Sequence, residues 1–305
     1  MDGILNINKP LEMTSYRMVA LVKRLSGERH AGHAGTLDPA ASGVLPVCLG
    51  QATRVVEYLM QATKTYRAEI ELGVTTDTYD AAGKVTETKD ASHITREQVE
   101  SALAAFSGTI SQTPPMYSAV RHHGQRLYSL ARAGITVDRP SRLAQIYSLK
   151  FTDWQSPVAT IEVECGKGTY IRSLAHDLGQ SLGCGASLKS LVRLRYGPFA
   201  LADALSLPRL EEAARDNKWI EFLHPIDSVL AHLSAVTVDE PTTRAITCGQ
   251  AVTLPGQNNS PPPGTGSRCR VYNPSGDLLA ILSFNTETGQ WHPDKVFLPP
   301  RAPPC

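Results

Sequence analysis

The segment GHAGTLDPAASGVLPVCLGQATR, residues 32–54, leads from a flexible loop into an apolar run and carries one carboxylate between them. Glycines at 32, 35 and 43 permit a tightly folded loop, and Pro39 disfavours helical geometry at Asp38. The apolar residues 44–49 predict a core strand. Asp38 is therefore displayed on a shaped loop directly before a strand. Because Asp-Pro is also a common turn pair, this segment alone is compatible with an ordinary turn.

Two further segments carry candidate functional side chains. KGTYIRSLAHDLG, residues 167–179, predicts a turn into a helix with Tyr170 and Arg172 in its first turn. Since a helix N-terminus favours anions, an arginine there invites a carboxylate or phosphate partner. KTYRAEIELGVTTDTYDAAG, residues 64–83, begins an alternating strand at Tyr66. The structural alternatives are a surface arginine on a capped helix and an aromatic side chain in the core.

Helical and alternating patterns interleave around these segments. Apolar spacing predicts a helix that starts at residue 14 or 15 and stops at Gly27, and Thr95-x-x-Gln98 predicts a capping box for another. Alternation predicts strands at 66–72 and 159–165. We therefore expect a mixed α/β domain around an antiparallel or mixed sheet, with a boundary near residue 232 before a smaller, strand-rich part.

Composition limits the classes of function. The chain has 305 residues, of which 42% are hydrophobic and 19% charged, so it can bury a sizeable core. It has no apolar run of about 18 residues and no signal peptide, so we expect a cytoplasmic protein without membrane contact. Six cysteines without CxxC spacing predict reduced thiols and no metal site. No phosphate-binding loop, dinucleotide fingerprint or HExxH motif is present.

Charge is uneven although the net charge is only +1. Residues 114–145 hold five arginines against one acidic residue, Asp138. Residues 185–200 hold three basic residues and no acidic one. Such patches suit contacts with phosphates, and the other interpretation is a solvated surface.

Together these segments resemble the bacterial tRNA pseudouridine-55 synthases of the TruB family. GHAGTLDPAASGVL is similar to the catalytic motif of that family, NINKPLEMTS to its N-terminal motif, and PPMYSAVRHHGQRLYSLAR to its RNA-binding insertion. KGTYIRSLAHDLG and LVRLRYGPF are similar to further blocks, in order across residues 1–200. TRAITCGQAV and CRVYNPSGDLLAIL resemble a PUA-type RNA-binding domain. The Pro/Gly-rich stretch 257–267 departs from the family as an insertion, and Arg121 stands where many relatives carry lysine.

The resemblance implies an α/β (α+β) pseudouridine synthase fold, with a mixed, largely antiparallel sheet and flanking helices in residues 1–232. It implies an RNA-binding insertion at about 111–145, a small β-rich PUA-like domain at 233–300 and a disordered tail at 301–305. The implied activity isomerises uridine 55 in the T loop of tRNA to pseudouridine, by base flipping, aspartate-dependent glycosidic cleavage and C–C rejoining. The implied partner is the T arm of tRNA, with no cofactor and no protein partner for a monomeric enzyme.

The resemblance also assigns roles to single residues. Asp38 matches the catalytic aspartate, Tyr66 the tyrosine that stacks on the target base, and Arg172 the arginine that pairs with the aspartate. Substrate-binding roles fall to Lys9, which supports the active-site loop, to His33, which packs against the flipped-out tRNA loop, to Asp80 near the RNA, and to Tyr170 and Leu191, which line the uracil pocket. Phosphate contacts are predicted for Arg121, Arg126, Arg132, Lys189 and Arg193.

The chemistry of Asp38 is open at this point. Its reference pKa of ~3.9 leaves the carboxylate ionised at neutral pH, and a nearby arginine would favour that form. The carboxylate either attacks the sugar or removes a ribose proton to give a glycal. Two other classes of protein are a non-catalytic RNA-binding protein, which does not require Asp38, and a glycosidase, which usually needs two carboxylates. Only one candidate carboxylate is evident from the sequence.

Overall fold

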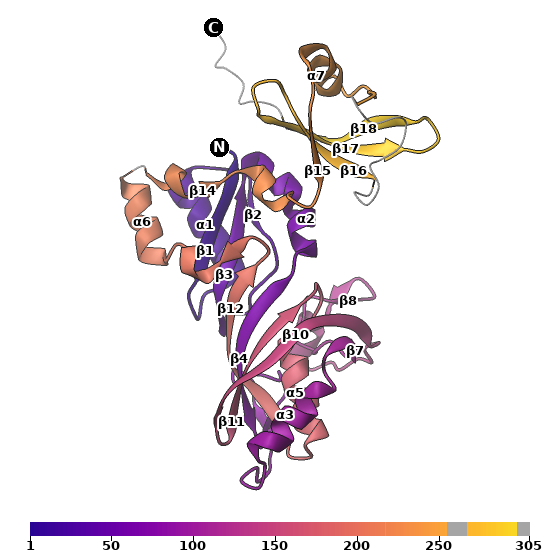
Figure 1. Cartoon of the computed structure of the whole chain (residues 1–305). Helices are drawn as coiled ribbons and strands as arrows, with labels where there is room; N and C mark the ends of the chain where they lie inside the picture. Colours follow the sequence, from indigo (N-terminus) through magenta and orange to yellow (C-terminus); the bar gives the residue numbers. More distant parts are fainter. Residues whose placement is uncertain (217, 255–266, 298–305) are drawn as a thin grey trace.

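The computed structural model describes residues 1–216, 218–254 and 267–297 (Figure 1). The predicted insertion at 257–267, apart from Ser267, lies outside the described residues, as does the tail at 301–305. Among the described residues no helix is long and apolar enough to cross a membrane.

The larger part of the molecule is built around a ten-stranded sheet. Its strands follow the order β14-β1-β3-β12-β4-β11-β10-β7, with β2 paired to β3 and β13 to β12. The β3–β12 pair is parallel and the other pairs are antiparallel, which confirms the predicted mixed, largely antiparallel sheet. The strands are β1 Gly3–Lys9, β2 Ala31–His33, β3 Ala41–Leu49, β4 Lys64–Leu72, β7 Gly108–Gln112, β10 Arg142–Gln155, β11 Val158–Cys165, β12 Ala186–Tyr196, β13 Phe199–Ala200 and β14 Leu223–His224.

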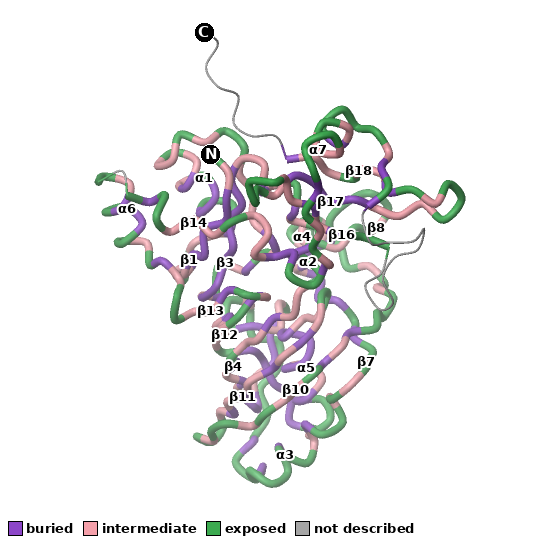
Figure 2. The backbone as a smooth tube through the Cα atoms, turned by 45° about the horizontal axis from the view of Figure 1, so that its top comes forward, coloured by how far each residue is buried: buried purple, intermediate pink, exposed green. Residues whose placement is uncertain are grey.

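Helices cover this sheet in two groups (Figure 1). Near β1, α1 (Ser15–Ser26) and α6 (Leu207–Arg215) share a buried cluster that includes Leu5, Met18 and Leu210. At the other end, α3 (Arg96–Ala104) and α5 (Ile171–Ser181) pack against β4 and β11. Figure 2 shows the buried residues concentrated along the strands and exposed ones over α3.

Local signals set the ends of two helices as predicted. The Thr14 side chain accepts a hydrogen bond from Arg17 N at the start of α1, and Gly27 ends the helix with a φ of 68°. Thr95 and Gln98 form the predicted capping box of α3. The other short helical elements that flank this sheet are η1 Gly50–Val55, α2 Val56–Gln61, η2 Leu201–Asp203, η3 Trp219–Phe222 and η4 Ile226–Val229.

Two excursions leave the sheet near its α5 side. The first is the hairpin of β5 (Val74–Thr76) and β6 (Val85–Thr88), whose connection spans residues 77–84. The second lies between β7 and β10 and holds β8 (Arg121–His122), β9 (Gln125–Arg126) and α4 (Leu127–Arg132). Both excursions carry residues that the sequence singled out.

The C-terminal part is a separate four-stranded sheet in the order β15-β16-β17-β18, with α7 against it. Its Ile281 and Phe297 belong to one buried cluster with Tyr58 of α2 and Leu233, so it packs on the larger part through apolar contacts. Lys295 Nζ lies 2.6 Å from Glu57 Oε1 across the same interface. The elements are β15 Ser234–Thr237, α7 Glu240–Thr247, β16 Arg268–Tyr272, β17 Leu278–Asn285 and β18 Gln290–Val296.

Candidate active site

The loop before β3 is tied down on several sides. Ser15 Oγ accepts a hydrogen bond from Leu37 N at 2.9 Å and donates one to Leu37 O at 3.0 Å. Glu12 N donates to Pro39 O at 2.8 Å, and Ala41 N donates to Asp38 O at 3.0 Å. Asp38 therefore sits on a loop whose backbone is fixed by α1, by the turn before it and by its own turn, which reduces the cost of holding the carboxylate in one place.

Lys9 supports the turn that contacts this loop. Its side chain is fully buried, and Nζ donates to Pro10 O at 2.8 Å and to Met13 O at 2.7 Å. Burial lowers the pKa of the Lys9 ammonium to about 8, although the nearby charge of Asp38 opposes this change. The bonds of Lys9 are thus made to backbone carbonyls of the 10–13 turn.

Arg172 connects the loop with the 77–84 connection. Nη2 lies 3.0 Å from Asp38 Oδ2 and donates to Tyr117 O at 2.9 Å. Nη1 lies 3.6 Å from Asp80 Oδ2 and donates to Thr78 O at 3.3 Å. The position of Arg172 at the start of α5 predicted a carboxylate partner, and the structure provides two, Asp38 and Asp80. The Arg172 side chain is only 8% exposed.

Asp38 is the accessible member of this group. Its side chain is 44% exposed, against 12% for Asp80. Desolvation raises the pKa of the Asp38 carboxyl above its ordinary value, Arg172 opposes that change, and Asp80 adds to it. Arg172 thus favours the ionised form as expected, but the effect of burial is larger than the effect of its charge. A carboxylate that is accessible and whose charge is only partly balanced by its arginine partner is suited to act on a bound molecule.

The Asp80 carboxylate accepts hydrogen bonds from residues of its own loop. Thr78 Oγ1 donates to Asp80 Oδ1 at 2.6 Å, and Ala82 N donates to the same oxygen at 3.1 Å. Tyr79 between them adopts a φ of 64° and stacks on His176 of α5, with ring centroids 3.9 Å apart at 11°. This stack joins the loop of Asp80 to the helix of Arg172. Sequence analysis missed it, because the two rings are far apart in the chain and no local pattern marks them.

A small hollow lies beside Asp38. Its walls are partly apolar, with Leu188 and Leu191 of β12, and the exposed Lys189 lies at its edge. Such a mixture of apolar walls and a few polar groups is typical of a small-molecule site. The residues that line the hollow are Asp38, Ala40, Ala41, Asp80, Ala81, Leu188, Lys189, Ser190 and Leu191.

Three further residues singled out by the resemblance lie, like Lys9 and Arg172, outside that lining. Tyr66 is half-buried on β4, directly opposite Arg193 of β12. Tyr170 is the residue before α5, where its backbone exchanges hydrogen bonds of 3.0 and 3.1 Å with the Gln112 side chain. His33 lies on β2, and burial together with the charge of Arg193 lowers the pKa of its imidazole.

Arg193 is not the surface residue that its basic neighbours suggested. It is 1% exposed, and its guanidinium donates from Nε to Val44 O at 2.6 Å and from Nη2 to Gly35 O at 3.0 Å. The prediction that it contacts a phosphate is therefore wrong for the described structure. The prediction failed because it assumed that all three basic residues of β12 are exposed. β12 is a central strand, and only Lys189 and Arg195 are exposed.

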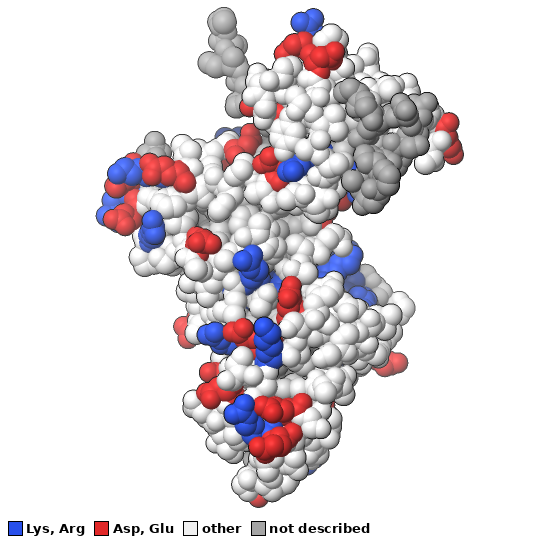
Figure 3. All heavy atoms as spheres, viewed as in Figure 1, with Lys and Arg blue, Asp and Glu red and all other residues white. Residues whose placement is uncertain are grey.

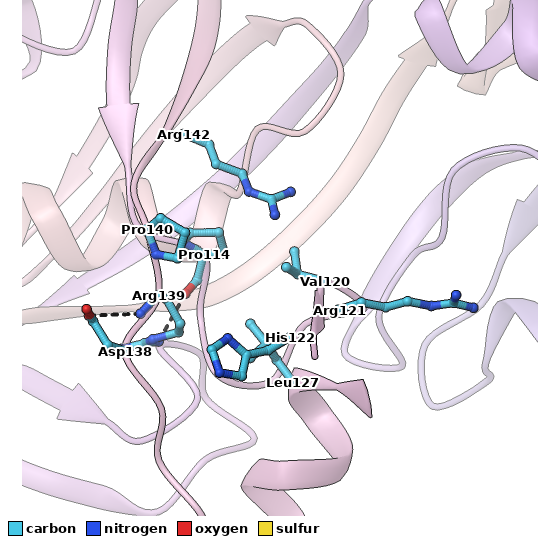
Figure 4. A pocket seen from close by; sticks show the side chains of 9 residues that line it. All are labelled: Pro114, Val120, Arg121, His122, Leu127, Asp138, Arg139, Pro140 and Arg142. Atoms are coloured by element: carbon cyan, nitrogen blue, oxygen red, sulfur yellow. Dashed lines mark hydrogen bonds between the residues drawn. The ribbon is translucent and has the colours of Figure 1, made fainter. Parts of the chain in front are cut away.

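The basic excursion between β7 and β10 displays its arginines. Arg121 and Arg126 face each other across the β8–β9 pair, and Arg126, Arg132 and Arg121 are all exposed. In Figure 4 the Arg142 guanidinium extends over a second hollow, whereas Arg139 is turned to Pro114 O at 3.0 Å. This hollow is lined by Pro114, Val120, Arg121, His122, Leu127, Asp138, Arg139, Pro140 and Arg142.

The face shown in Figure 3 presents basic and acidic side chains next to each other over the larger part of the molecule. It therefore offers no continuous basic surface to a polyanion. The exposed arginines of the β7–β10 excursion are accordingly a local feature.

Known structures share this architecture. The chain matches the crystal structure of a Cbf5-Nop10-Gar1 complex with a TM-score of 0.73 and 27% identity, over 97% of this chain and 85% of that one. It matches the structure of an H/ACA RNP bound to a substrate RNA containing 2'-deoxyuridine with a TM-score of 0.72 and 25% identity, over 97% and 85%. The sheet, its flanking helices and the site on the β3 loop are thus built on a pseudouridine synthase fold.

Sequence comparisons are more specific. Residues 23–171 match the N-terminal domain of the TruB family pseudouridylate synthases, and residues 172–231 match a tRNA pseudouridylate synthase B C-terminal domain. The tRNA pseudouridine synthase B of Dehalococcoides mccartyi is 49% identical over 298 residues, 98% of this chain and 97% of that protein. That of Pelotomaculum thermopropionicum is 40% identical over 306 aligned positions, 98% and 96%. The chain belongs to the TruB family of pseudouridylate synthases.

Proposed function

We propose that this protein isomerises uridine 55 in the T loop of tRNA to pseudouridine. The observation that carries the proposal is the accessible Asp38 carboxylate, held 3.0 Å from Arg172 at the edge of a hollow with apolar walls. The names of the relatives supply the substrate class, because they are called tRNA pseudouridine synthase B. The hollow is a suitable place for a uracil ring that has left the base stack.

The residues of the site divide the work. Asp38 acts at the sugar of the target uridine, and Arg172 holds its carboxylate toward the hollow. Tyr66 stacks on the target base, and Tyr170 and Leu191 line the uracil pocket. The bond between N1 and the sugar breaks, and the base remains in the pocket while it is detached. Carbon 5 then bonds to the same sugar carbon and loses its proton to solvent, while N1 gains a proton, so no co-reactant is consumed.

A glycosidase reaction is less well supported. Asp80 supplies a second carboxylate near Asp38, which the sequence did not reveal as a partner. Its oxygens are engaged by Arg172, Thr78 Oγ1 and Ala82 N, and the residue is 8% exposed. A general acid or base must reach the substrate or a water molecule, so Asp80 is a poor second catalytic group.

The T arm is gripped by exposed basic residues on two sides of the site. Arg121, Arg126 and Arg132 lie on the β7–β10 excursion, and Lys189 lies at the edge of the Asp38 hollow. Each contact with a phosphate releases counterions, so replacing one of these residues with alanine lowers the slope of log affinity against log salt by about one unit. His33 packs against the flipped-out tRNA loop. Asp80 lies near the RNA through its place in the hollow.

The domain plan forms part of the proposal. Residues 1–232 form the synthase domain, with residues of about 111–145 as its RNA-binding insertion, and residues 233–300 form a PUA-like accessory domain. We further propose a cytoplasmic monomer that needs no protein partner. In support of two domains, the ten-stranded sheet contains no described strand after β14, and β15 begins a second sheet at Ser234.

The direct test is site-resolved pseudouridine mapping on unmodified tRNA incubated with the purified protein. We expect one modified position, uridine 55, with no change of mass and no free uracil. Release of uracil would assign the protein to the glycosidases. Binding of tRNA without any conversion would assign it to the non-catalytic RNA-binding proteins.

A further inference from the structure

Arg193 is a buried charge that the proposed chemistry does not use. It is 1% exposed, and none of the ion pairs formed by the described residues includes it. Arginine stays protonated in proteins, so a guanidinium at this position carries the cost of desolvation without a carboxylate to offset it. An apolar side chain of similar volume would fill the space at lower cost. The role of Arg193 must therefore depend on its particular contacts.

These contacts lie at the two ends of the catalytic loop. Nη2 donates to Gly35 O at 3.0 Å and Nε donates to Val44 O at 2.6 Å. Asp38 lies between these two carbonyls along the chain. One planar guanidinium thus joins the entry and the exit of the loop, which a single ammonium cannot do in the same geometry.

The loop is also packed against the neighbour of Arg193 on the same strand. The Arg193 guanidinium carbon lies 4.8 Å from the ring centroid of Tyr196. Gly35 has a φ of 65°, and a Cβ there would lie 2.9 Å from Tyr196 Cε1. The close approach of the loop to Tyr196 therefore requires glycine at position 35. This approach determines the distance between the loop and β12.

Tyr66 lies on the strand next to Arg193. Arg193 is its direct partner in the β12–β4 register. Burial raises the pKa of the Tyr66 phenol, while the charge of Arg193 acts in the opposite direction. Arg193 thus holds the loop that carries Asp38 and lies directly opposite the aromatic residue proposed to hold the base.

We propose that Arg193 is a positioning residue, which fixes the Asp38 loop and the Tyr66 ring relative to each other and makes no contact with RNA. The inference rests on the proposed synthase activity. It assigns the basic cluster of β12 two distinct tasks. Lys189 faces the RNA, whereas Arg193 organises the groups that act on the base.

The test compares Arg193→Lys and Arg193→Met with Arg67→Met as a matched control. Arg67 is an exposed arginine on the neighbouring strand, beside Tyr66, and its pair with Glu162 at 2.9 Å lies on the surface. We expect kcat on tRNA to fall by roughly ten- to a hundredfold in Arg193→Lys, because small displacements of reacting groups have effects of that size. KM, the dissociation constant and the salt slope should stay within about twofold of wild type. Arg67→Met should retain wild-type kcat.

Hydrogen exchange supplies a readout that does not depend on activity. Peptides covering residues 34–44 should exchange faster in Arg193→Lys than in Arg67→Met, while peptides from α7 stay unchanged. If wild-type protein produces no pseudouridine, the proposed function fails and this measurement still tests the positioning role.

Three results would overturn the inference. One is wild-type kcat in a folded Arg193→Lys protein, even if its melting temperature falls, because the residue would then serve stability alone. Another is weaker binding with a salt slope lower by about one unit, which would make Arg193 a phosphate contact. The last is unchanged exchange in residues 34–44. If Arg193→Met does not fold, the lysine variant decides the question.

Discussion

Replacing Arg172 with methionine removes the group that joins the three segments of the site. The side chain is 8% exposed and contacts Asp38, Asp80 and two backbone carbonyls. Methionine fills much of the same space without a charge. The variant therefore leaves the Asp80 carboxylate buried without its cation and leaves the carbonyls of Thr78 and Tyr117 without this donor.

The expected loss of stability is large for one residue. Breaking a buried ion pair by removing one partner costs about 3–5 kcal/mol, because the other charge stays buried. The 44% exposed Asp38 contributes little to this, since pairs at the surface are worth about 0–1 kcal/mol. Most of the loss therefore comes from Asp80 and the two carbonyls. Changing Asp80 to Asn in the same protein removes the stranded charge, and we expect it to restore about 1–3 kcal/mol.

The pH dependence has a definite direction. The pKa of Asp38 already lies above its ordinary value, and Arg172 is the main group that opposes this. Without Arg172 the pKa rises further, so the unfolded chain releases this proton at lower pH than the folded protein. The stability lost by the variant relative to wild type therefore grows once the pH exceeds the raised pKa of Asp38 in the wild-type protein. The rise of kcat with pH, which follows ionisation of Asp38, shifts to higher pH.

Urea melts at pH 4, 5.5 and 7 measure the first effect, and single-turnover kinetics against pH measure the second. Arg96→Met is the control, because Arg96 forms an exposed i,i+4 pair with Glu100 on α3, far from these contacts. The reasoning is refuted if Arg172→Met is within 1 kcal/mol of wild type and its pH profile is unchanged. It is also refuted if Asp80→Asn destabilises the variant further.

Other variants test neighbouring contacts. The pKa of Lys9 is about 8 in the folded protein against 10.5 for the ordinary side chain, so burial of the charged form destabilises the protein most below pH 8. Between pH 8 and 10.5 the free energy of unfolding of wild type should rise by up to about 3 kcal/mol relative to that of Lys9→Met. The same pH dependence of this free energy in both proteins, measured by chemical denaturation, would contradict this. Tyr79→Ala should lower the free energy of unfolding by about 0.5–1.5 kcal/mol, because the stack on His176 is lost, and it should also lower kcat. Tyr79→Phe should keep wild-type stability and kcat. An equal fall of kcat and stability in the two variants would assign the effect to the hydroxyl. Truncation after residue 232 should raise KM more than it lowers kcat, and it should also lower the melting temperature, because Phe297 packs on the larger part. Complete loss of turnover in a folded truncated protein would give the C-terminal part a catalytic role.

The sequence predicted those parts of the fold that short-range patterns encode. The Thr14 cap and Gly27 define α1, and the capping box defines α3, because these signals act within one helical turn. The loop that carries Asp38 was also evident, since its glycines lie close to Asp38 and Pro39 in the sequence. The strand β12 was not, because Lys189, Arg193 and Arg195 obscure its alternation and its burial depends on pairing with β3 and β4.

The same limit applies to the site. Tyr79 and His176 meet only because the 77–84 connection folds against α5, and the anchoring of Leu37 by Ser15 depends on how α1 packs. The number and spacing of basic residues suggested that Arg193 is exposed, whereas the strand order of the sheet buries it. Contacts between distant segments carry this information, and no periodicity within a short window records it.

The central claim is that Asp38 performs the chemistry, and Asp38→Asn tests it most directly. Asparagine keeps the size and shape of the side chain but removes the charge, so the protein should fold and bind tRNA with a dissociation constant within roughly threefold of wild type, a change of less than about 1 kcal/mol. Tritium release from tRNA labelled at carbon 5 of uridine should fall below detection. Clear residual turnover would contradict the claim and move the reactive role to another group. Parallel loss of tRNA binding and melting temperature would instead make Asp38 a structural residue of its turn.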